Sequence, residues 1–326
     1  MLALLAAVGA VLCFSMVPVF LRHFAKLLDF WTVNGVRYTT GALFWLPYVI
    51  ASMRRPRQPR PVEDGKVPAP LEGPFPRGHR WVWLYALIPA AVNIVGQVGW
   101  GLAPYYNSAP TIGFAIRSAF LFTALLGFAF IPAERAVARR PTFYYGAVVC
   151  ALGLMLMFAE PLLGRQPSGH ERTSVPGMLI LLWVAVCWGG YAVSVRIFMA
   201  GFPIRLAFGV VSLYTAAGLV TLMFLRGDYR QLGNLAVVNL ILLVVSGVIG
   251  IAFGHVFHYR AIHGLGPVIA SGMQLACPFV ISAAAWVFLG ETMTGLQLLG
   301  GMTILAGGYL LVRAKALADA RAQPRP

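Results

Sequence analysis

The chain has 326 residues, of which 59% belong to the apolar set AVILMFWYC and only 11% are charged, and its mean hydropathy is +0.78. A soluble domain contains about a quarter charged residues, so this composition excludes an ordinary soluble protein. The formal net charge is +15. Its Lys and Arg residues lie in connectors beside apolar runs and form no single basic face, which argues against a nucleic-acid partner and fits contact with lipid head groups.

Apolar runs of about 20 residues, the length that crosses a bilayer, recur along the chain. Each must be helical in lipid, because an unpaired backbone amide finds no water there. The first run has no basic segment before it and no clear cleavage site after it, so we interpret it as a retained span. The four cysteines lie inside apolar runs without a C-x-x-C pair, which indicates buried apolar residues. In chain order the expected spans are residues 2–21, 31–51, 81–101, 109–131, 142–159, 176–197, 205–225, 237–261, 267–289 and 295–312.

The connectors predict the orientation of these spans. With a cytoplasmic amino terminus, sixteen Lys and Arg residues fall in the cytoplasmic connectors and tail, and six fall in the outer connectors. This asymmetry predicts that both termini are cytoplasmic, in the cell (inner) membrane. The connector 52–80 is rich in Pro and Arg and has no apolar periodicity, so we expect a flexible cytoplasmic loop.

The second half of the chain repeats the first. Span 4 matches span 9 at an offset of 157 positions, through Pro110 and Pro267 among others, and spans 1, 2 and 5 match spans 6, 7 and 10 in the same order. Five spans per repeat is an odd number, so the second repeat must be inverted in the membrane, an arrangement that many secondary transporters use around a central site. The expected units are residues 1–160 and 161–316, each a five-helix repeat, and a cytoplasmic tail, 317–326.

Three features of the sequence resemble those of a known family. They are two glutamates at span ends, the glycine-spaced helices that follow them, and an arginine early in span 2. The residues are Glu134, Glu291, Gly146, Gly153, Gly300, Gly307 and Arg37. In these features the chain resembles EamA-type members of the drug/metabolite transporter superfamily. The resemblance implies ten helices and export of amino acids, other metabolites or toxic compounds.

Arg117 is the main candidate for a binding residue, because it lies about eight residues into span 4. A guanidinium at that depth is costly unless it finds water or a partner. Its repeat counterpart, Gln274, is also polar, so the pair could line a central cavity in which Arg117 holds a carboxylate bidentately. The alternative, that Arg117 reaches the outer interface or makes a structural contact, stays open.

Polar and aromatic residues of three other spans complete the candidate site. Asn93 and Gln97 share one face of span 3, where they either line a cavity or join helices. His255 in span 8 is a candidate, although satisfied packing is favoured over proton binding. Trp188 and Tyr191 of span 6 offer an aromatic wall, with helix packing as the favoured alternative.

Three charged residues are expected to be structural. Glu134 and Glu291 can satisfy free amides at a helix start, with a role in transport coupling as the less favoured alternative. Arg37 is expected to set orientation or make an ionic contact between helices. No span carries a carboxylate near its middle, and the first span has Leu12-Cys13-Phe14-Ser15 where small multidrug exporters that resemble half of this fold have a glutamate. This departure disfavours export of cations.

The sequence therefore predicts an all-α integral membrane protein of ten transmembrane helices in two inverted repeats. Its expected function is secondary transport, in the export direction, of small metabolites such as amino acids or organic anions, as a monomer or homodimer without cofactor or metal. Multidrug cation efflux and a receptor or scaffold role are the alternatives. An enzyme is disfavoured, because no catalytic motif is present. The expected substrate-binding residues are Arg117, Gln274, Asn93, Gln97, His255, Trp188 and Tyr191.

Overall fold

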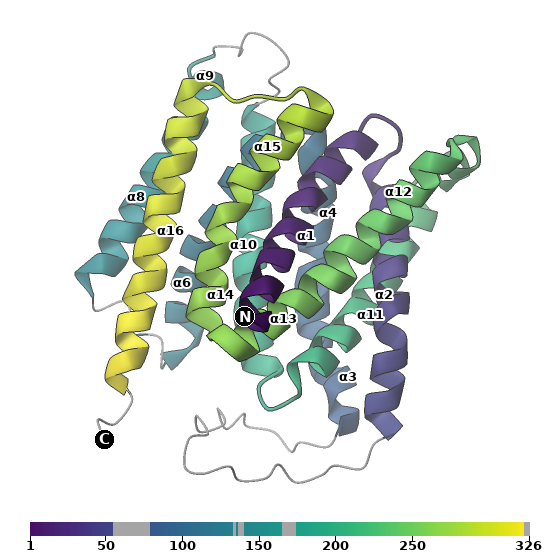
Figure 1. Ribbon diagram of the computed structural model, residues 1–326, viewed down its shortest axis with the longest axis horizontal. Coiled ribbons are helices and arrows are strands. Elements are labelled where there is room, and N and C mark those ends of the chain that lie inside the picture. Colours follow the sequence, from purple (N-terminus) through teal and green to yellow (C-terminus); the bar gives the residue numbers. More distant parts are fainter. Residues whose placement is uncertain (55–78, 133–134, 136–139, 165–173, 323–326) are drawn as a thin grey trace.

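The computed structural model describes residues 1–54, 79–132, 135, 140–164 and 174–322, which form helices and no strand. Figure 1 shows the long helices packed side by side. Most of the expected loop 52–80 and the candidate Glu134 lie outside the described residues. The helices of the first half are α1 (Leu2–Phe24), α2 (Phe30–Arg54), η1 (His79–Trp81), α3 (Val82–Tyr85), α4 (Leu87–Tyr106), α5 (Ala109–Ala115), η2 (Ile116–Ser118), α6 (Ala119–Phe130), α8 (Pro141–Met157) and α9 (Ala159–Leu162).

The second half follows the same plan. Its last helix extends well past residue 312, where the apolar run ends, so the expected tail at 317–326 begins inside this helix. The helices are α10 (Val175–Phe198), α11 (Ile204–Arg226), η4 (Tyr229–Asn234), α12 (Val237–Gly247), η5 (Val248–Phe253), α13 (Gly254–Leu265), α14 (Pro267–Met273), η6 (Gln274–Ala276), α15 (Cys277–Leu289) and α16 (Gly295–Ala322).

Among the described residues, eight helical segments are long and apolar enough to cross a membrane. The apolar helix α8 is shorter than these, with 17 residues. Helix α2 has 25 residues, but Asn34, Arg37 and neighbouring polar residues lower its hydropathy. The protein is thus an all-helical, multi-pass membrane protein, and the count of ten spans stays a prediction.

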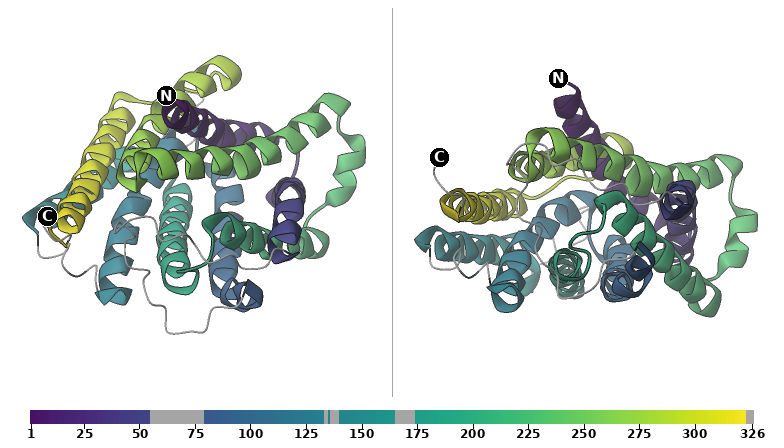
Figure 2. Two further views of the ribbon diagram at one scale, coloured as in Figure 1. Left: turned by 60° about the horizontal axis from the view of Figure 1, so that its bottom comes forward. Right: turned by 90° about the horizontal axis from the view of Figure 1, so that it is seen from below.

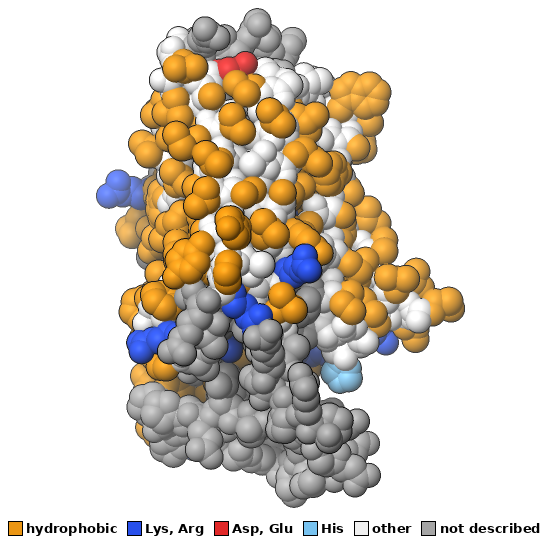
Figure 3. All heavy atoms as spheres, turned by 90° about the vertical axis from the view of Figure 1, so that its left-hand side faces the viewer, with side chains coloured by type: hydrophobic (Ala, Val, Ile, Leu, Met, Phe, Trp, Pro, Cys, Tyr) orange, Lys and Arg blue, Asp and Glu red, His pale blue; other side chains and the backbone are white. Residues whose placement is uncertain are grey.

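The exterior of the bundle is apolar, as a surface in contact with lipid must be. Large side chains such as Trp286, Tyr145 and Val237 are 66%, 67% and 71% exposed. Figure 3 shows hydrophobic side chains over most of the described face, with most of the visible Lys and Arg towards its lower end. A soluble protein rarely exposes so continuous an apolar surface.

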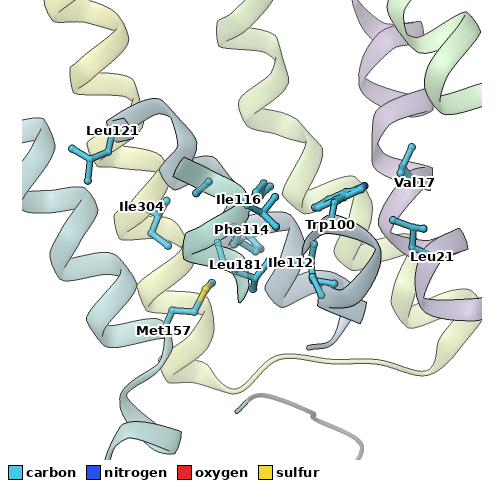
Figure 4. Packing of buried hydrophobic residues seen from close by; sticks show 14 of the residues in the cluster. Val17, Leu21, Trp100, Ile112, Phe114, Ile116, Leu121, Met157, Leu181 and Ile304 are labelled. Carbon is cyan, nitrogen blue, oxygen red and sulfur yellow. The ribbon is translucent and has the colours of Figure 1, made fainter. Parts of the chain in front are cut away.

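Helices from the first half pack mainly against helices from the second half. The most extensive contacts join α8 with α16, α2 with α11, α4 with α10, and α1 with α13. Seen from below, α1 lies in one layer with α13, α15 and α16, and α4, α6 and α10 lie in the other (Figure 2, right). Figure 4 shows apolar residues of both halves, including Phe114, Leu181 and Ile304, meeting in one core.

Glycines allow a close approach of α8 and α16. A Cβ atom on Gly307 would lie 2.5 Å from the backbone nitrogen of Cys150, and one on Gly300 would lie 2.3 Å from that of Met157. On the other helix, a Cβ on Gly153 would lie 2.6 Å from the nitrogen of Ile304. Small residues at such contacts let helix backbones approach each other in membranes.

Polar side chains tie several segments together where α1 ends. The end of α1 lies in the upper part of the bundle in Figure 1. Arg22, near the end of α1, donates from Nε to Glu291 Oε1 at 2.5 Å, and its Nη1 donates to the carbonyl of Pro104. Glu291 Oε2 accepts a hydrogen bond from the backbone amide of Ala109 at 2.8 Å. The carboxylate therefore satisfies an amide at the start of α5, and not one of α16, the helix that follows it in the chain.

Candidate functional site

A cavity of about 360 Å³ lies inside the bundle. Its walls come from α1, α2, α4, α10, α11 and α15, from the region of η5 and α13, and from the two short helices η2 and η6. This volume lies near the lower limit for small-molecule sites, which suits a compact solute. The cavity brings together all seven residues that the sequence predicts for substrate binding: Arg117, Gln274, Asn93, Gln97, His255, Trp188 and Tyr191.

Two interrupted spans place polar residues in this cavity. The α-helix of span 4 gives way to the 3₁₀ turn η2, which contains Arg117, and that of span 9 gives way to η6, which begins at Gln274. Arg117 and Gln274 are repeat counterparts, so the two interruptions occur at matching positions. Broken helices of this kind are where transporters commonly form their central sites.

Arg117 lies in the cavity wall with an unsatisfied donor. Its Nε is buried and has no hydrogen-bond partner among the described residues. A buried donor without a partner is unfavourable, and a guanidinium at membrane depth is costly as well. Both costs fall if an anion binds beside this side chain.

Arg37 also lines the cavity, although its residue type and position in span 2 led us to expect a structural role. The residue is 2% exposed, and its Nε donates to Ser246 Oγ at 3.0 Å. The hydroxyl of Ser246 in turn donates to the carbonyl of Leu243 at 2.7 Å. Like Arg117, Arg37 is a charged residue inside a span. This feature could have identified Arg37 as a cavity residue from the sequence.

None of the described residues that line the cavity is an Asp or a Glu. The wall therefore contains two guanidinium groups and no carboxylate to balance them. The ion pair formed by Arg22 and Glu291 lies elsewhere, at the upper end of α1. Electrostatically, the cavity is suited to anions.

The amides in the wall also join helices. Asn93 Nδ2 donates to Thr215 Oγ1 at 3.0 Å, which links α4 to α11, and Gln97 Nε2 contacts Asn93 Oδ1 at 3.4 Å. Gln274 Oε1 accepts from Cys277 Sγ at 3.1 Å. The two roles that the sequence left open for Asn93 and Gln97, cavity lining and helix contact, thus coexist in the structure.

Aromatic rings form much of the remaining wall. His255 is stacked on Phe208 with ring centroids 4.1 Å apart, and its Nδ1 lies 3.2 Å from the carbonyl of Gly250. Gly250 belongs to η5, a π-helical turn, and such turns are frequent at functional sites. Trp188 packs against Trp100 at a centroid distance of 4.7 Å.

Comparison with known proteins agrees with this architecture. Residues 175–313 match the model of the EamA-like transporter family. No curated protein matches the chain. One solved structure, described only as a crystal structure of a protein, is 18% identical, covers 98% of this chain and 99% of its own, and has a TM-score of 0.57. At this identity the likeness establishes the fold alone.

The eight apolar helical segments among the described residues identify a multi-pass membrane protein, and the family match implies a transporter and not an enzyme. Within this class, the match over residues 175–313 is to the EamA-like transporter family. The resemblance that the sequence indicated is thereby confirmed.

Proposed function

We propose that the protein is a secondary transporter of small organic anions, with the cavity around Arg117 as its substrate site. The observation that carries this proposal is the buried, unpartnered Nε of Arg117 in a cavity whose described wall has no carboxylate. Arginine can bind a carboxylate or phosphate bidentately, which gives both affinity and orientation. Gln274, Asn93 and Gln97 would supply neutral hydrogen bonds beside it.

Transport would follow an alternating-access cycle between two inverted five-helix repeats, residues 1–160 and 161–316. The helix contacts support this arrangement. Helices α1 and α10 are repeat counterparts, and so are α4 and α13. A two-fold axis would therefore convert the contact between α1 and α13 into the contact between α10 and α4, and the structure has both. The same axis would relate the contact of α6 with α10 to that of α1 with α15. Rocking of two such repeats exposes a central site to each side in turn.

The proposed location is the cell (inner) membrane, with both termini in the cytoplasm and transport in the export direction. The concentration of Lys and Arg near one end of the bundle supports this orientation (Figure 3). The proposed unit is a monomer, although a homodimer is compatible with it, because side chains of a single chain enclose the cavity.

Counterflow in proteoliposomes tests this function. Vesicles containing the purified protein and an unlabelled solute are mixed with labelled organic anions, amino acids or quaternary cations. We expect exchange of an anion or amino acid by the wild type, loss of exchange in Arg117→Gln, and wild-type exchange in Arg205→Gln, whose arginine is exposed and outside the cavity.

The remaining outcomes contradict the proposal in different ways. Exchange of quaternary cations that is unaffected by Arg117→Gln would identify a cation exporter. Absence of exchange for every solute in the panel would contradict a transport function for small anions and favour a receptor or scaffold.

A further inference from the structure

The cavity wall contains a second cationic side chain, Arg37. The substrate site proposed above binds one anionic group through Arg117 and assigns no role to Arg37. Arg37 and Arg117 come from different elements, α2 and η2, and both line the same space of about 360 Å³. We propose that the transported solute carries two anionic groups, one bound by each arginine. This inference rests on the proposed transport function and specifies its substrate class.

Arg37 is held in place but is not neutralised. Its only hydrogen bond among the described residues runs from Nε to the neutral hydroxyl of Ser246. That contact fixes the side chain and leaves the two terminal nitrogens of the guanidinium for another partner. A carboxylate or phosphate is the natural partner for those nitrogens, because it accepts two parallel hydrogen bonds.

The guanidinium of Arg37 lies beside the π-helical turn η5. A Cβ atom on Gly250 of this turn would lie 3.4 Å from Arg37 Nη2 and 2.6 Å from Val17 Cγ2, so the side chains of Arg37 and Val17 pack closely on this glycine. Gly250 and its neighbour Ile251 also line the cavity. At least one terminal nitrogen of Arg37, Nη2, therefore lies beside a residue of the cavity wall.

Charge balance explains why two anionic groups are needed. A single carboxylate would leave one of the two arginines buried in the membrane interior without a counter-charge, which is unfavourable. A solute with two anionic groups balances the positive charges of both arginines at once. Such a solute is an organic dicarboxylate, and the aromatic rings and small volume of the cavity restrict it to a compact size.

The wild-type protein alone provides the first test. Succinate and succinamate have the same length, but succinamate replaces one carboxylate with a neutral amide. We expect succinate to inhibit counterflow at a concentration at least ~30-fold lower than succinamate, because a buried charge pair is lost with the amide.

A variant of Arg37 provides the second test. In Arg37→Gln we expect the preference for the dianion over the matched monoanion to fall to less than ~3-fold, because only the pair with Arg117 remains. Arg37→Lys should keep part of the preference, since it keeps the charge but loses the planar fork. Arg205→Gln, which changes an exposed arginine outside the cavity, should keep all of it.

The failure of this inference is distinguishable from failure of the proposed function. If the wild type exchanges succinamate or an amino acid as well as it exchanges succinate, transport stands and the two-anion substrate is wrong. The same conclusion follows if Arg37→Gln folds and keeps the full preference. If the variant does not fold, the comparison of matched solutes in the wild type still decides the question.

Discussion

At the scale of single residues, the ion pair between Arg22 and Glu291 joins segments from both halves of the chain. The side chains are 7% and 4% exposed, so the pair is shielded from water. Arg22 also binds the carbonyl of Pro104, and Glu291 also binds the amide of Ala109. The loss of either partner would leave the other charge buried without compensation.

We therefore predict that Arg22→Gln and Glu291→Gln each destabilise the folded protein by about 3 kcal/mol. The double variant should lose less than the sum of the two, with a coupling of at least about 1 kcal/mol. Thermal or denaturant unfolding in detergent measures these values, with Arg205→Gln as the exposed control. Strictly additive losses would show that the two side chains do not stabilise the fold as a pair.

Sequence reasoning located several of the polar cavity residues by one physical rule, that polar side chains inside a span need an interior environment. Arg117, Gln274, Asn93 and Gln97 all satisfy this rule and all line the cavity. Arg37 satisfies it equally well but was assigned a structural role, because its position matches a family feature. Its contact with Ser246, 209 residues away, depends on tertiary packing that the sequence does not reveal.

At the scale of elements, the contact between α8 and α16 depends on glycines that match between the two halves. Gly146 and Gly153 have the same spacing as Gly300 and Gly307, and the structure brings the two sets against each other. A Cβ on Gly146 would lie 3.0 Å from the carbonyl oxygen of Gly307. The sequence revealed the matching spacing, whereas the direct contact is a finding of the structure.

Substitution of two adjacent glycines on α16 should distinguish the effect of helix packing on stability from the effect of helix propensity. Gly307→Ala should destabilise the protein by about 1–3 kcal/mol, because its Cβ would clash with the backbone of Cys150. Gly308→Ala should be neutral or stabilising by up to about 1 kcal/mol, because its nearest neighbour is the side chain of Phe120 at 3.4 Å and alanine favours the helix. Thermal unfolding of both variants in detergent checks this difference in sign. Equal effects would mean that α8 and α16 are not closely packed.

The interruptions of spans 4 and 9 were beyond sequence reasoning. Both spans appeared as continuous apolar runs, and neither Gly nor Pro marks residues 116–118 or 274–276. The short turns η2 and η6 arise there in the packed structure, beside the cavity. By contrast, the length of the apolar runs predicted where most spans lie. Helix α2 is long enough for a span but less apolar than the others, and helix α8 is apolar but shorter.

At the scale of the whole molecule, the two cavity arginines constrain the transport cycle. In the proposed mechanism the cavity is open to one side of the membrane at a time. It must pass through a state that is closed to both sides before it opens to the opposite side. Without solute, that closed state would enclose two guanidinium groups with no carboxylate in the described wall. Each would cost about 2.5–3.5 kcal/mol in the membrane interior. The empty transporter should therefore change sides much more slowly than the loaded one.

Uptake of a labelled dianion by proteoliposomes, with and without the unlabelled solute trapped inside, tests the account most directly. We predict rapid uptake when the solute is trapped, uptake at least ~100-fold slower into solute-free vesicles, and neither with Arg117→Gln. Equal uptake into both kinds of vesicle would contradict the charge-balance mechanism. Uptake no greater than in vesicles without the protein would contradict a dianion transporter altogether.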